Sequence, residues 1–261
     1  MRFKDKVVFV TGGTRGLGKA VAEAFLEEGA KVAVNGRKSE AVERFRAEHA
    51  PGAARAFAAD ICDYAAMEAV AESLVREWGG IDILINNAGI VNPLVPSAKM
   101  KREDFDRVID VNLKGAFYVT QIVGRRMIER GAGRIVSISS QVALFGEKGF
   151  LPYAIGKAGI QLMTRNLASE WGRSGVTLCC LAPGYIKGGM NEGLAKRQDL
   201  VDFLSARTPV QRMGTVGELV GTVLFLASPE AAYINGETIV MDGGLTGYAS
   251  ETLLDAITKG K

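Results

Sequence analysis

Short apolar runs alternate with longer segments of helical periodicity along almost the whole chain. The first run, residues 6–11, is apolar on both faces, which is typical of a strand buried inside a parallel sheet. Similar runs predict six further strands, at residues 31–35, 54–59, 81–85, 134–138, 176–181 and 237–241. The segments between them predict helices at residues 17–28, 39–49, 63–78, 103–129, 153–172 and 216–227.

This order of elements predicts the α/β class. Strands that alternate with helices at this spacing favour one doubly wound parallel sheet of about seven strands, with helices on both faces. Residues 185–215 lack a strand pattern, and we expect them to form short helices on an excursion from the sheet. Because no repeat, low-complexity stretch or linker interrupts the pattern, we expect residues 1–261 to form a single domain.

Composition narrows the possible functions. The 261 residues are 48% hydrophobic and 23% charged, and the net charge of +3 gives no reason to expect a nucleic acid or membrane partner. Three cysteines, Cys62, Cys179 and Cys180, lack ligand or disulfide spacing, so buried thiols in a reducing cytoplasm are expected. With His49 as the only histidine, we expect neither a Ser-His-Asp hydrolase nor a histidine metal site.

Apolar stretches of the chain are also too short for a membrane span, and the first residues lack the apolar region of a signal peptide. We therefore expect a cytoplasmic protein with no metal.

A glycine cluster follows the first predicted strand. Residues 12–18 read Gly-Gly-Thr-Arg-Gly-Leu-Gly and lead directly into a predicted helix. Glycines at 12, 16 and 18 allow a tight turn and a close approach of the backbone to a pyrophosphate, which would sit at the positive end of the helix. A tight turn with no ligand would have the same glycines. The cluster alone therefore leaves both interpretations open.

The end of the second strand bears on which dinucleotide would be bound. Proteins that prefer NAD usually carry Asp or Glu here, for the ribose 2′-hydroxyl. This chain has Asn-Gly-Arg-Lys at 35–38, and the guanidinium of Arg37 suits a 2′-phosphate, with Arg15 available from the glycine turn. The alternative is that Arg37 and Lys38 only solvate the start of a helix.

Tyr153 and Lys157 are four residues apart on a predicted helix and so share one face. A neighbouring lysine cation favours the phenolate and lowers the pKa of the tyrosine toward neutrality, as proton transfer requires. A half-buried tyrosine beside a solvated lysine would show the same spacing. The location of the pair supports the first interpretation, because the candidate residues gather at the carboxyl ends of strands, where ligands bind in such sheets.

In its motifs, the chain resembles the short-chain dehydrogenase/reductase family over nearly its whole length. The resemblance rests on the Thr-Gly-Gly-Thr-Arg-Gly-Leu-Gly segment at 11–18, Asn-Asn-Ala-Gly at 86–89, Ser140 thirteen residues before Tyr153, and Pro-Gly at 183–184, together with Asp60, Asn112 and Lys157. It implies a Rossmann-type fold and hydride transfer between a nicotinamide cofactor and a carbonyl or secondary alcohol.

The resemblance also implies roles for individual residues. Tyr153 would be the general acid/base, Lys157 would lower its pKa and hold the cofactor ribose, and Ser140 would bind the substrate oxygen. Asn112 would hold a water of the proton relay, whereas Ser139 is expected to be structural. NADP(H) is expected in preference to NAD(H). The expected cofactor-binding residues are Gly12, Thr14, Arg15, Gly16, Leu17, Gly18, Arg37, Asp60, Ile61, Asn87, Ala88, Gly89, Tyr153, Lys157, Pro183, Gly184 and Ile186.

One position departs from the family. Many relatives have a threonine that grips the nicotinamide carboxamide a few residues after the Pro-Gly pair, and this chain has Gly188 there. Backbone near Ile186 would then have to hold the amide.

The carboxyl-terminal third is most similar to the branch that contains gluconate 5-dehydrogenase, so a sugar acid or similar small hydroxy-ketone is the expected substrate. Lys148, Lys187 and Arg102 are candidates to meet its carboxylate, although a solvated surface charge is the favoured interpretation of each. The alternatives are a 3-oxoacyl-[acyl carrier protein] reductase, a broad carbonyl reductase, and a non-catalytic cofactor-sensing protein. The resemblance further implies a homotetramer.

Overall fold

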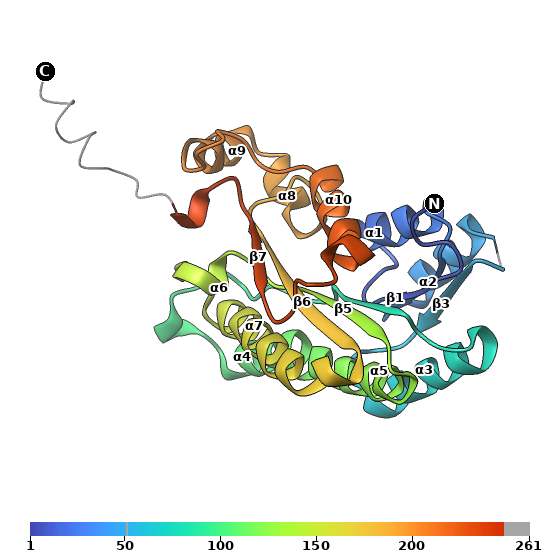
Figure 1. Cartoon of the computed structure of the whole chain (residues 1–261). Helices are drawn as coiled ribbons and strands as arrows, with labels where there is room; N and C mark the ends of the chain where they lie inside the picture. The colour runs from blue at the N-terminus through green and yellow to red at the C-terminus, as the bar shows by residue number, and fades with distance from the viewer. Residues whose placement is uncertain (51, 248–261) are drawn as a thin grey trace, which may run out of the picture.

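A seven-stranded parallel sheet forms the centre of the molecule in the order β3-β2-β1-β4-β5-β6-β7 (Figure 1). The computed structural model describes residues 1–50 and 52–247; residues 51 and 248–261 of the predicted domain lie outside this part. The doubly wound order confirms the predicted fold class. The strands are β1 (Val7–Val10), β2 (Lys31–Gly36), β3 (Ala54–Ala58), β4 (Ile83–Asn86), β5 (Gly133–Ile138), β6 (Val176–Pro183) and β7 (Thr238–Met241).

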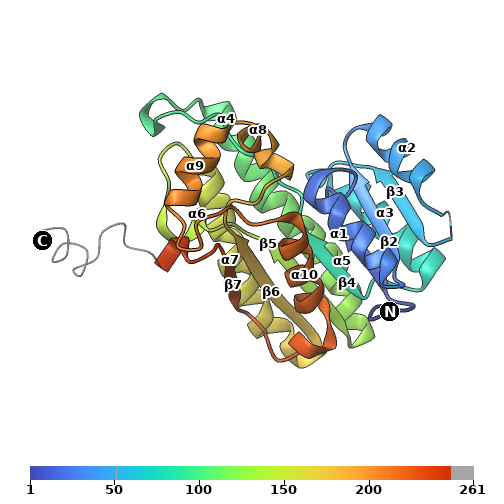
Figure 2. The same cartoon turned by 90° about the horizontal axis from the view of Figure 1, so that it is seen from above.

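Helices cover both faces of the sheet. Figures 1 and 2 show α1, α2 and α10 against one face and α3, α5 and α7 against the other. The helices are α1 (Gly16–Glu27), α2 (Ser39–Glu48), α3 (Tyr64–Trp78), α4 (Arg102–Ile109), α5 (Ala116–Arg130), α6 (Val142–Phe145), α7 (Leu151–Trp171), α8 (Glu192–Ala195), α9 (Gln198–Ala206) and α10 (Val216–Ala227). None of the helices in the described ranges combines the length and apolar character needed to cross a membrane.

Two cores, one on each side of the sheet, stabilise the fold. Phe25 of α1 and Leu219 of α10 pack on one face, and Leu74 of α3, Ile122 of α5 and Leu167 of α7 pack on the other. Because both faces are covered, the strands are apolar on both sides, which is the pattern that predicted a parallel sheet.

Most predicted boundaries are shifted by one or two residues, and two differences from the structure have a physical explanation. The helix expected at 103–129 is interrupted, because residues Asp110–Gly115 form a π-helical turn between α4 and α5. A π turn keeps the apolar pattern helical, so periodicity alone does not detect it. The strand expected at 81–85 begins later, at Ile83. The residue before it, Asp82, uses its side-chain carboxylate to accept a hydrogen bond from the Val7 N–H at 2.8 Å.

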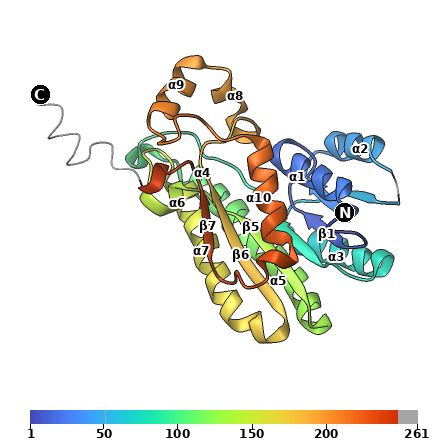
Figure 3. The same cartoon turned by 45° about the horizontal axis from the view of Figure 1, so that its top comes forward.

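The segment that leaves the sheet after β6 begins and ends at neighbouring positions. Ile186 and Gly214 form an isolated parallel bridge, in which the Lys187 N–H donates to the Gly214 carbonyl and the Gly214 N–H donates to the Tyr185 carbonyl, both at 2.9 Å. The chain between them carries α8 and α9, which stand at the top of the molecule in Figure 3. This segment therefore extends beyond the carboxyl ends of the strands, where the candidate site lies.

Candidate functional site

A cleft of about 580 Å³ runs along the carboxyl ends of β1, β2 and β4. Its walls include the glycine turn, the end of β2, the segment after β3 and the segment after β4. Most of the expected cofactor-binding residues line it: Gly12, Thr14, Arg15, Gly16, Leu17, Gly18, Arg37, Asp60, Ile61, Asn87, Ala88 and Gly89.

The glycine turn fits a bound pyrophosphate. Gly12 and Gly16 have φ of 65° and 57°, and a Cβ added to Gly12 would lie 3.0 Å from the Ala88 Cα. Arg15, at the N-cap of α1, makes no side-chain capping hydrogen bond, so the first-turn N–H groups at the cleft remain available to an anion. The buried Thr11 hydroxyl accepts the N–H groups of Asn87 and Ala88, each at 3.0 Å, and so fastens the turn to the end of β4.

At the end of β2, where proteins that prefer NAD usually carry Asp or Glu, the Asn35 side chain forms hydrogen bonds within the fold. Asn35 is buried, accepts the Gly12 N–H at 3.2 Å and donates to the Ala59 carbonyl at 2.9 Å. Asn35 lines the cleft, but its side-chain amide is committed to these two bonds, which join β2 to its neighbours. Arg15, Arg37 and Lys38 line this end of the cleft, and Arg37 Nη1 lies 3.9 Å from the Asp60 carboxylate.

Tyr153 and Ser140 are brought together beside the cleft. The Ser140 side chain lies near the Tyr153 phenol, and Phe150 packs against the same ring with centroids 6.1 Å apart. Burial raises the pKa of Tyr153, the Ser140 side chain lowers it, and the nearby Tyr185 phenol raises it. The net direction is upward, which is opposite to the direction expected from a neighbouring lysine cation.

Lys157 is not among the groups that shift the pKa of Tyr153. Its side chain is 3% exposed, and Nζ donates to the Ile138 carbonyl at 2.6 Å while lying 5.8 Å from the centre of the Tyr153 ring. Burial lowers the pKa of Lys157 to about 8. Ser139 has the expected structural position: its hydroxyl donates to the Lys157 carbonyl at 2.9 Å and accepts from Gln161 at 3.0 Å.

Asn112 lies in the π-helical turn, behind Lys157. Its Oδ1 accepts the Ile90 N–H and its Nδ2 donates to the Ile90 carbonyl, both at 2.8 Å. A Cβ on Gly89 would lie 3.3 Å from Asn112 Oδ1 and 3.4 Å from Lys157 Nζ, so these groups surround one small space. The amide thus ties the turn to the segment after β4, and the water-holding role expected of Asn112 stays a prediction.

The expected residues after β6 lie apart from the cleft. Pro183 ends the strand, whereas Gly184 and Ile186 line a second cavity of about 620 Å³ between α10, the end of β7 and the segment 208–214. Gly188 has φ of 123°, so a threonine there would be strained. Gly189 lines the cofactor cleft, and a Cβ on it would lie 2.8 Å from the Leu17 side chain. The glycine pair is therefore required for the chain to lie against the glycine turn.

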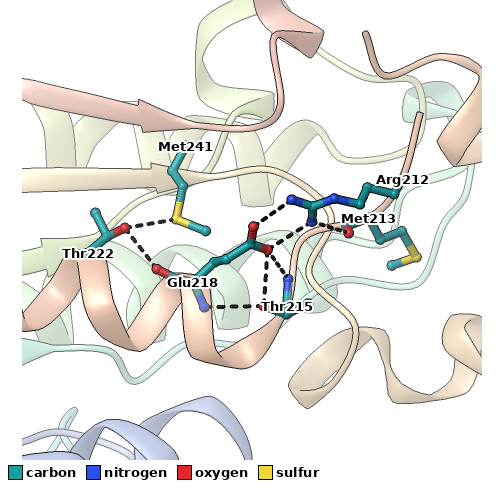
Figure 4. Close-up of polar contacts among 6 residues, drawn as sticks. All are labelled: Arg212, Met213, Thr215, Glu218, Thr222 and Met241. Atoms are coloured by element: carbon teal, nitrogen blue, oxygen red, sulfur yellow. Dashed lines mark hydrogen bonds and ion pairs between the residues drawn. The ribbon is translucent and has the colours of Figure 1, made fainter. Parts of the chain in front are cut away.

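The rim of the second cavity is held by an ion pair (Figure 4). Arg212 binds both oxygens of Glu218, at 2.6 and 2.9 Å, and the Glu218 carboxylate also accepts the Thr215 N–H at 2.8 Å. Hydrogen bonds from Arg212 and Thr215 lower the pKa of Glu218 to about 2. Thr215 and Glu218 form the capping box of α10, so the pair fastens the returning end of the excursion to that helix.

Several residues of the site were not identified from the sequence. Thr11 and Asn35 act through hydrogen bonds to distant segments, and Met190 lines the cleft from the excursion. Tyr185 lies near Tyr153, and its position directly after the Pro-Gly turn of β6 was a usable signal. No group of three or more His, Cys, Asp or Glu side chains within the described residues has the arrangement of a metal site.

Comparison with known proteins places the chain in a family. A family model described as "Enoyl-(Acyl carrier protein) reductase" matches residues 12–246. A gluconate 5-dehydrogenase of Gluconobacter oxydans is 38% identical over 241 residues, which are 91% of this chain and 93% of that protein. The chain belongs to the short-chain dehydrogenase/reductase family. A 3-oxoacyl-[acyl-carrier-protein] reductase of Thermotoga maritima is also 38% identical, over 94% of this chain and 99% of that protein.

Solved structures of the short-chain dehydrogenase/reductase family have the same fold. A gluconate 5-dehydrogenase of Burkholderia cenocepacia, in complex with NADP and tartrate, superposes with a TM-score of 0.87 at 35% identity, covering 95% of this chain and 98% of that one. Levodione reductase superposes with a TM-score of 0.89 at 35% identity, covering 95% and 100%. The protein is therefore an oxidoreductase that uses a nicotinamide cofactor and acts on a secondary alcohol or carbonyl.

The buried Lys157 of this dehydrogenase should make folding stability depend on pH. Between its folded pKa of about 8 and its ordinary value of 10.5, the unfolded chain holds a proton that the folded chain has lost. The free energy of unfolding of the parent, relative to Lys157→Met, should rise through this window by at most about 1.4 kcal/mol per pH unit and be constant outside it. Urea unfolding at closely spaced pH values measures this difference. A flat difference across the window would contradict a buried lysine with a lowered pKa.

Proposed function

We propose that the protein is an NADP(H)-preferring oxidoreductase that acts on a sugar acid or similar small hydroxy-ketone. The observation that supports the reaction is the meeting of Ser140, Tyr153 and Lys157 next to a cleft built around a glycine turn. The cofactor, when bound, supplies the hydride for reduction or accepts it in oxidation.

The side chains of the chain handle the proton. Tyr153 donates its phenolic proton to the carbonyl oxygen in reduction and accepts a proton from the alcohol in oxidation. Ser140, which lies near the phenol, binds the same substrate oxygen and stabilises the charge that develops there. The pKa of Lys157, about 8, lets this group lose and regain a proton near neutral pH. The Asn112 amide fixes the segment after β4, next to Lys157, through its two hydrogen bonds with the Ile90 backbone.

The preference for NADP(H) is supported by charge. Three cationic side chains, Arg15, Arg37 and Lys38, line the end of the cleft, and the only acid that lines it there among the described residues, Asp60, is within ion-pair distance of Arg37. The Burkholderia relative was solved with NADP.

Two substrate classes have support. The Gluconobacter relative is a gluconate 5-dehydrogenase, and the Burkholderia one was solved with tartrate, a hydroxylated dicarboxylate. The Thermotoga relative supports a 3-oxoacyl-[acyl-carrier-protein] reductase equally well by identity. Reduction of 5-ketogluconate, compared with an acetoacetyl thioester, separates the two classes, and comparable rates on both would indicate a broad carbonyl reductase.

Tyr153→Phe tests the catalytic assignment. Removing the hydroxyl leaves no proton donor at the carbonyl oxygen, so kcat/KM for NADPH-dependent ketone reduction should fall by about 10²- to 10⁴-fold. Tyr233→Phe, at a fully exposed tyrosine, is the matched control and should keep parental rates. Equal rates for Tyr153→Phe and the parent would refute the catalytic assignment of Tyr153, whereas a parent that reduces no ketone would favour a cofactor-sensing role.

Arg37→Asp tests the cofactor preference. We expect the parent to bind NADPH more tightly than NADH, and the variant to lose about 10- to 100-fold in NADPH affinity, because a carboxylate would face the 2′-phosphate. Titration of nucleotide fluorescence measures both affinities. Arg44→Asp, on an exposed position of α2 away from the cleft, controls for net charge. If the parent binds NADH more tightly than NADPH, the proposal that the cationic side chains at this end of the cleft bind the 2′-phosphate is refuted.

We also propose that the chain assembles as a homotetramer through α5, α7 and β7. On α7, Ile155 and Leu162 are 42% and 58% exposed, and Phe117 on α5 is 36% exposed. β7 lies at one edge of the described sheet, with Val240 41% exposed. Light scattering should give the mass of four chains, and Leu162→Arg should reduce it by placing a charge in an apolar contact. A parental mass of one chain would refute the assembly.

A further inference from the structure

Asn92 bridges two segments of the site. It lies in the segment after β4 and is 3% exposed. Its Nδ2 donates to the carbonyls of Pro93 and Gly149, both at 2.7 Å. A Cβ added to Gly149 would lie 3.6 Å from the Leu94 Cα, so the segment before α7 lies against the segment after β4. Asn92 therefore fastens the segment after β4 to the start of the helix that carries Tyr153.

The orientation of the Asn92 amide is defined by these two bonds. Its Oδ1 is buried and has no hydrogen-bond partner among the described residues. Turning the amide over would place this oxygen against two carbonyl oxygens, neither of which can donate a hydrogen bond. A buried acceptor without a partner lowers stability, so the presence of this side chain calls for a reason other than stability.

The first turn of α7 depends on this bridge. Phe150, the N-cap residue, forms no side-chain capping hydrogen bond, so the helix start lacks the local anchor that a serine, threonine, aspartate or asparagine provides. The Asn92 amide binds the carbonyl of the residue directly before that N-cap. The Phe150 ring meets the Tyr153 ring edge to face, with centroids 6.1 Å apart and planes at 62°. A displacement of Gly149 would therefore move both the backbone and the ring that hold Tyr153.

The other end of the bridge is fixed to the cofactor cleft. Asn112 forms two hydrogen bonds with the Ile90 backbone, both at 2.8 Å, and Ile90 and Val91 line the cleft. Asn92 follows directly in the chain. The bridge thus sets the position of α7 relative to this wall of the cleft.

We propose that Asn92 is a positioning residue for proton transfer, which sets the place of Tyr153 relative to the cofactor cleft. This assignment rests on the proposed function and deepens it. A carbonyl group receives the hydride at its carbon and the proton at its oxygen, from two groups that this chain holds on separate segments. An error of about 1 Å between such groups costs up to about 100-fold in rate.

Asn92→Ala tests this role with 5-ketogluconate or an acetoacetyl thioester, whichever the parent reduces faster. Loss of the amide should lower kcat by about 10- to 100-fold, while NADPH affinity changes by less than about 3-fold. The solvent deuterium isotope effect on kcat should rise, because proton transfer from a misplaced Tyr153 then limits the rate more strongly.

Asn235→Ala is the matched control, because Asn235 makes the same kind of bridge near the other end of α7. Its Nδ2 donates to the Ala168 carbonyl at 3.3 Å, and its Oδ1 accepts the Leu178 N–H at 2.9 Å. This variant should unfold at a lower urea concentration and keep the parental kcat and isotope effect.

Asn92→Asp adds a pH signature. The carboxyl of this variant has the shape of the amide but donates a hydrogen bond only when it is protonated, and burial brings that protonation toward neutral pH. The ratio of its kcat to that of the parent should therefore rise as the pH falls, whereas the ratio for Asn92→Ala stays constant. Because this comparison uses one variant at several pH values, it also serves if Asn92→Ala does not fold.

A parental kcat and isotope effect for Asn92→Ala, an equal loss for Asn235→Ala, or a ratio for Asn92→Asp that does not change with pH would overturn the positioning role. Each of these outcomes leaves the catalytic assignment of Tyr153 standing, because Tyr153→Phe tests that assignment separately. Parental rates for Tyr153→Phe, or a parent that reduces no ketone, would overturn the proposed function and this assignment with it.

Discussion

The site depends on one buried cation. Lys157 is enclosed by protein, its Nζ donates to the Ile138 carbonyl, and burial lowers its pKa to about 8. Placing the Lys157 ammonium there requires neighbouring residues that leave space for it and that provide polar groups. Gly89 supplies the room, since a Cβ on it would lie 3.4 Å from Nζ, and Asn112 Oδ1 would lie 3.3 Å from the same Cβ. The glycine after β4 and the asparagine of the π turn are thus consequences of the same requirement.

Long-range hydrogen bonds transmit this arrangement to the rest of the cleft. Asn112 holds Ile90, and Thr11 holds Asn87 and Ala88, so the segment after β4 is fixed between the π turn and the glycine turn. The two ends of the site are therefore joined through the edge of the sheet. A cofactor long enough to span the cleft would meet a surface whose parts are already in position, which lowers the ordering cost of binding.

The sequence predicted what depends on local pattern. The strands follow from apolar runs, and the glycine turn and the Tyr153–Lys157 pair follow from spacings of only a few residues. Other features depend on partners distant in sequence. The amide of Asn112 acts on Ile90, and Asn35 is committed to Gly12 and Ala59. The upward direction of the Tyr153 pKa was missed because it depends on how deeply the phenol is buried and on Tyr185, neither of which a spacing of four residues contains.

The π-helical turn at Asp110–Gly115 has a consequence for the length of this segment. A π turn holds one residue more than an α turn, and each residue of an α-helix rotates the chain by about 100°. A helical wheel drawn through residues 102–130 as one helix therefore assigns α4 and α5 to mismatched faces. Substitutions that preserve the apolar pattern keep the extra residue and the rotation that it introduces between α4 and α5. Deletion of one residue would remove this rotation and turn α4 away from α7. An insertion or deletion inside the turn consequently changes the orientation of α4 relative to α5 more than the surrounding substitutions do.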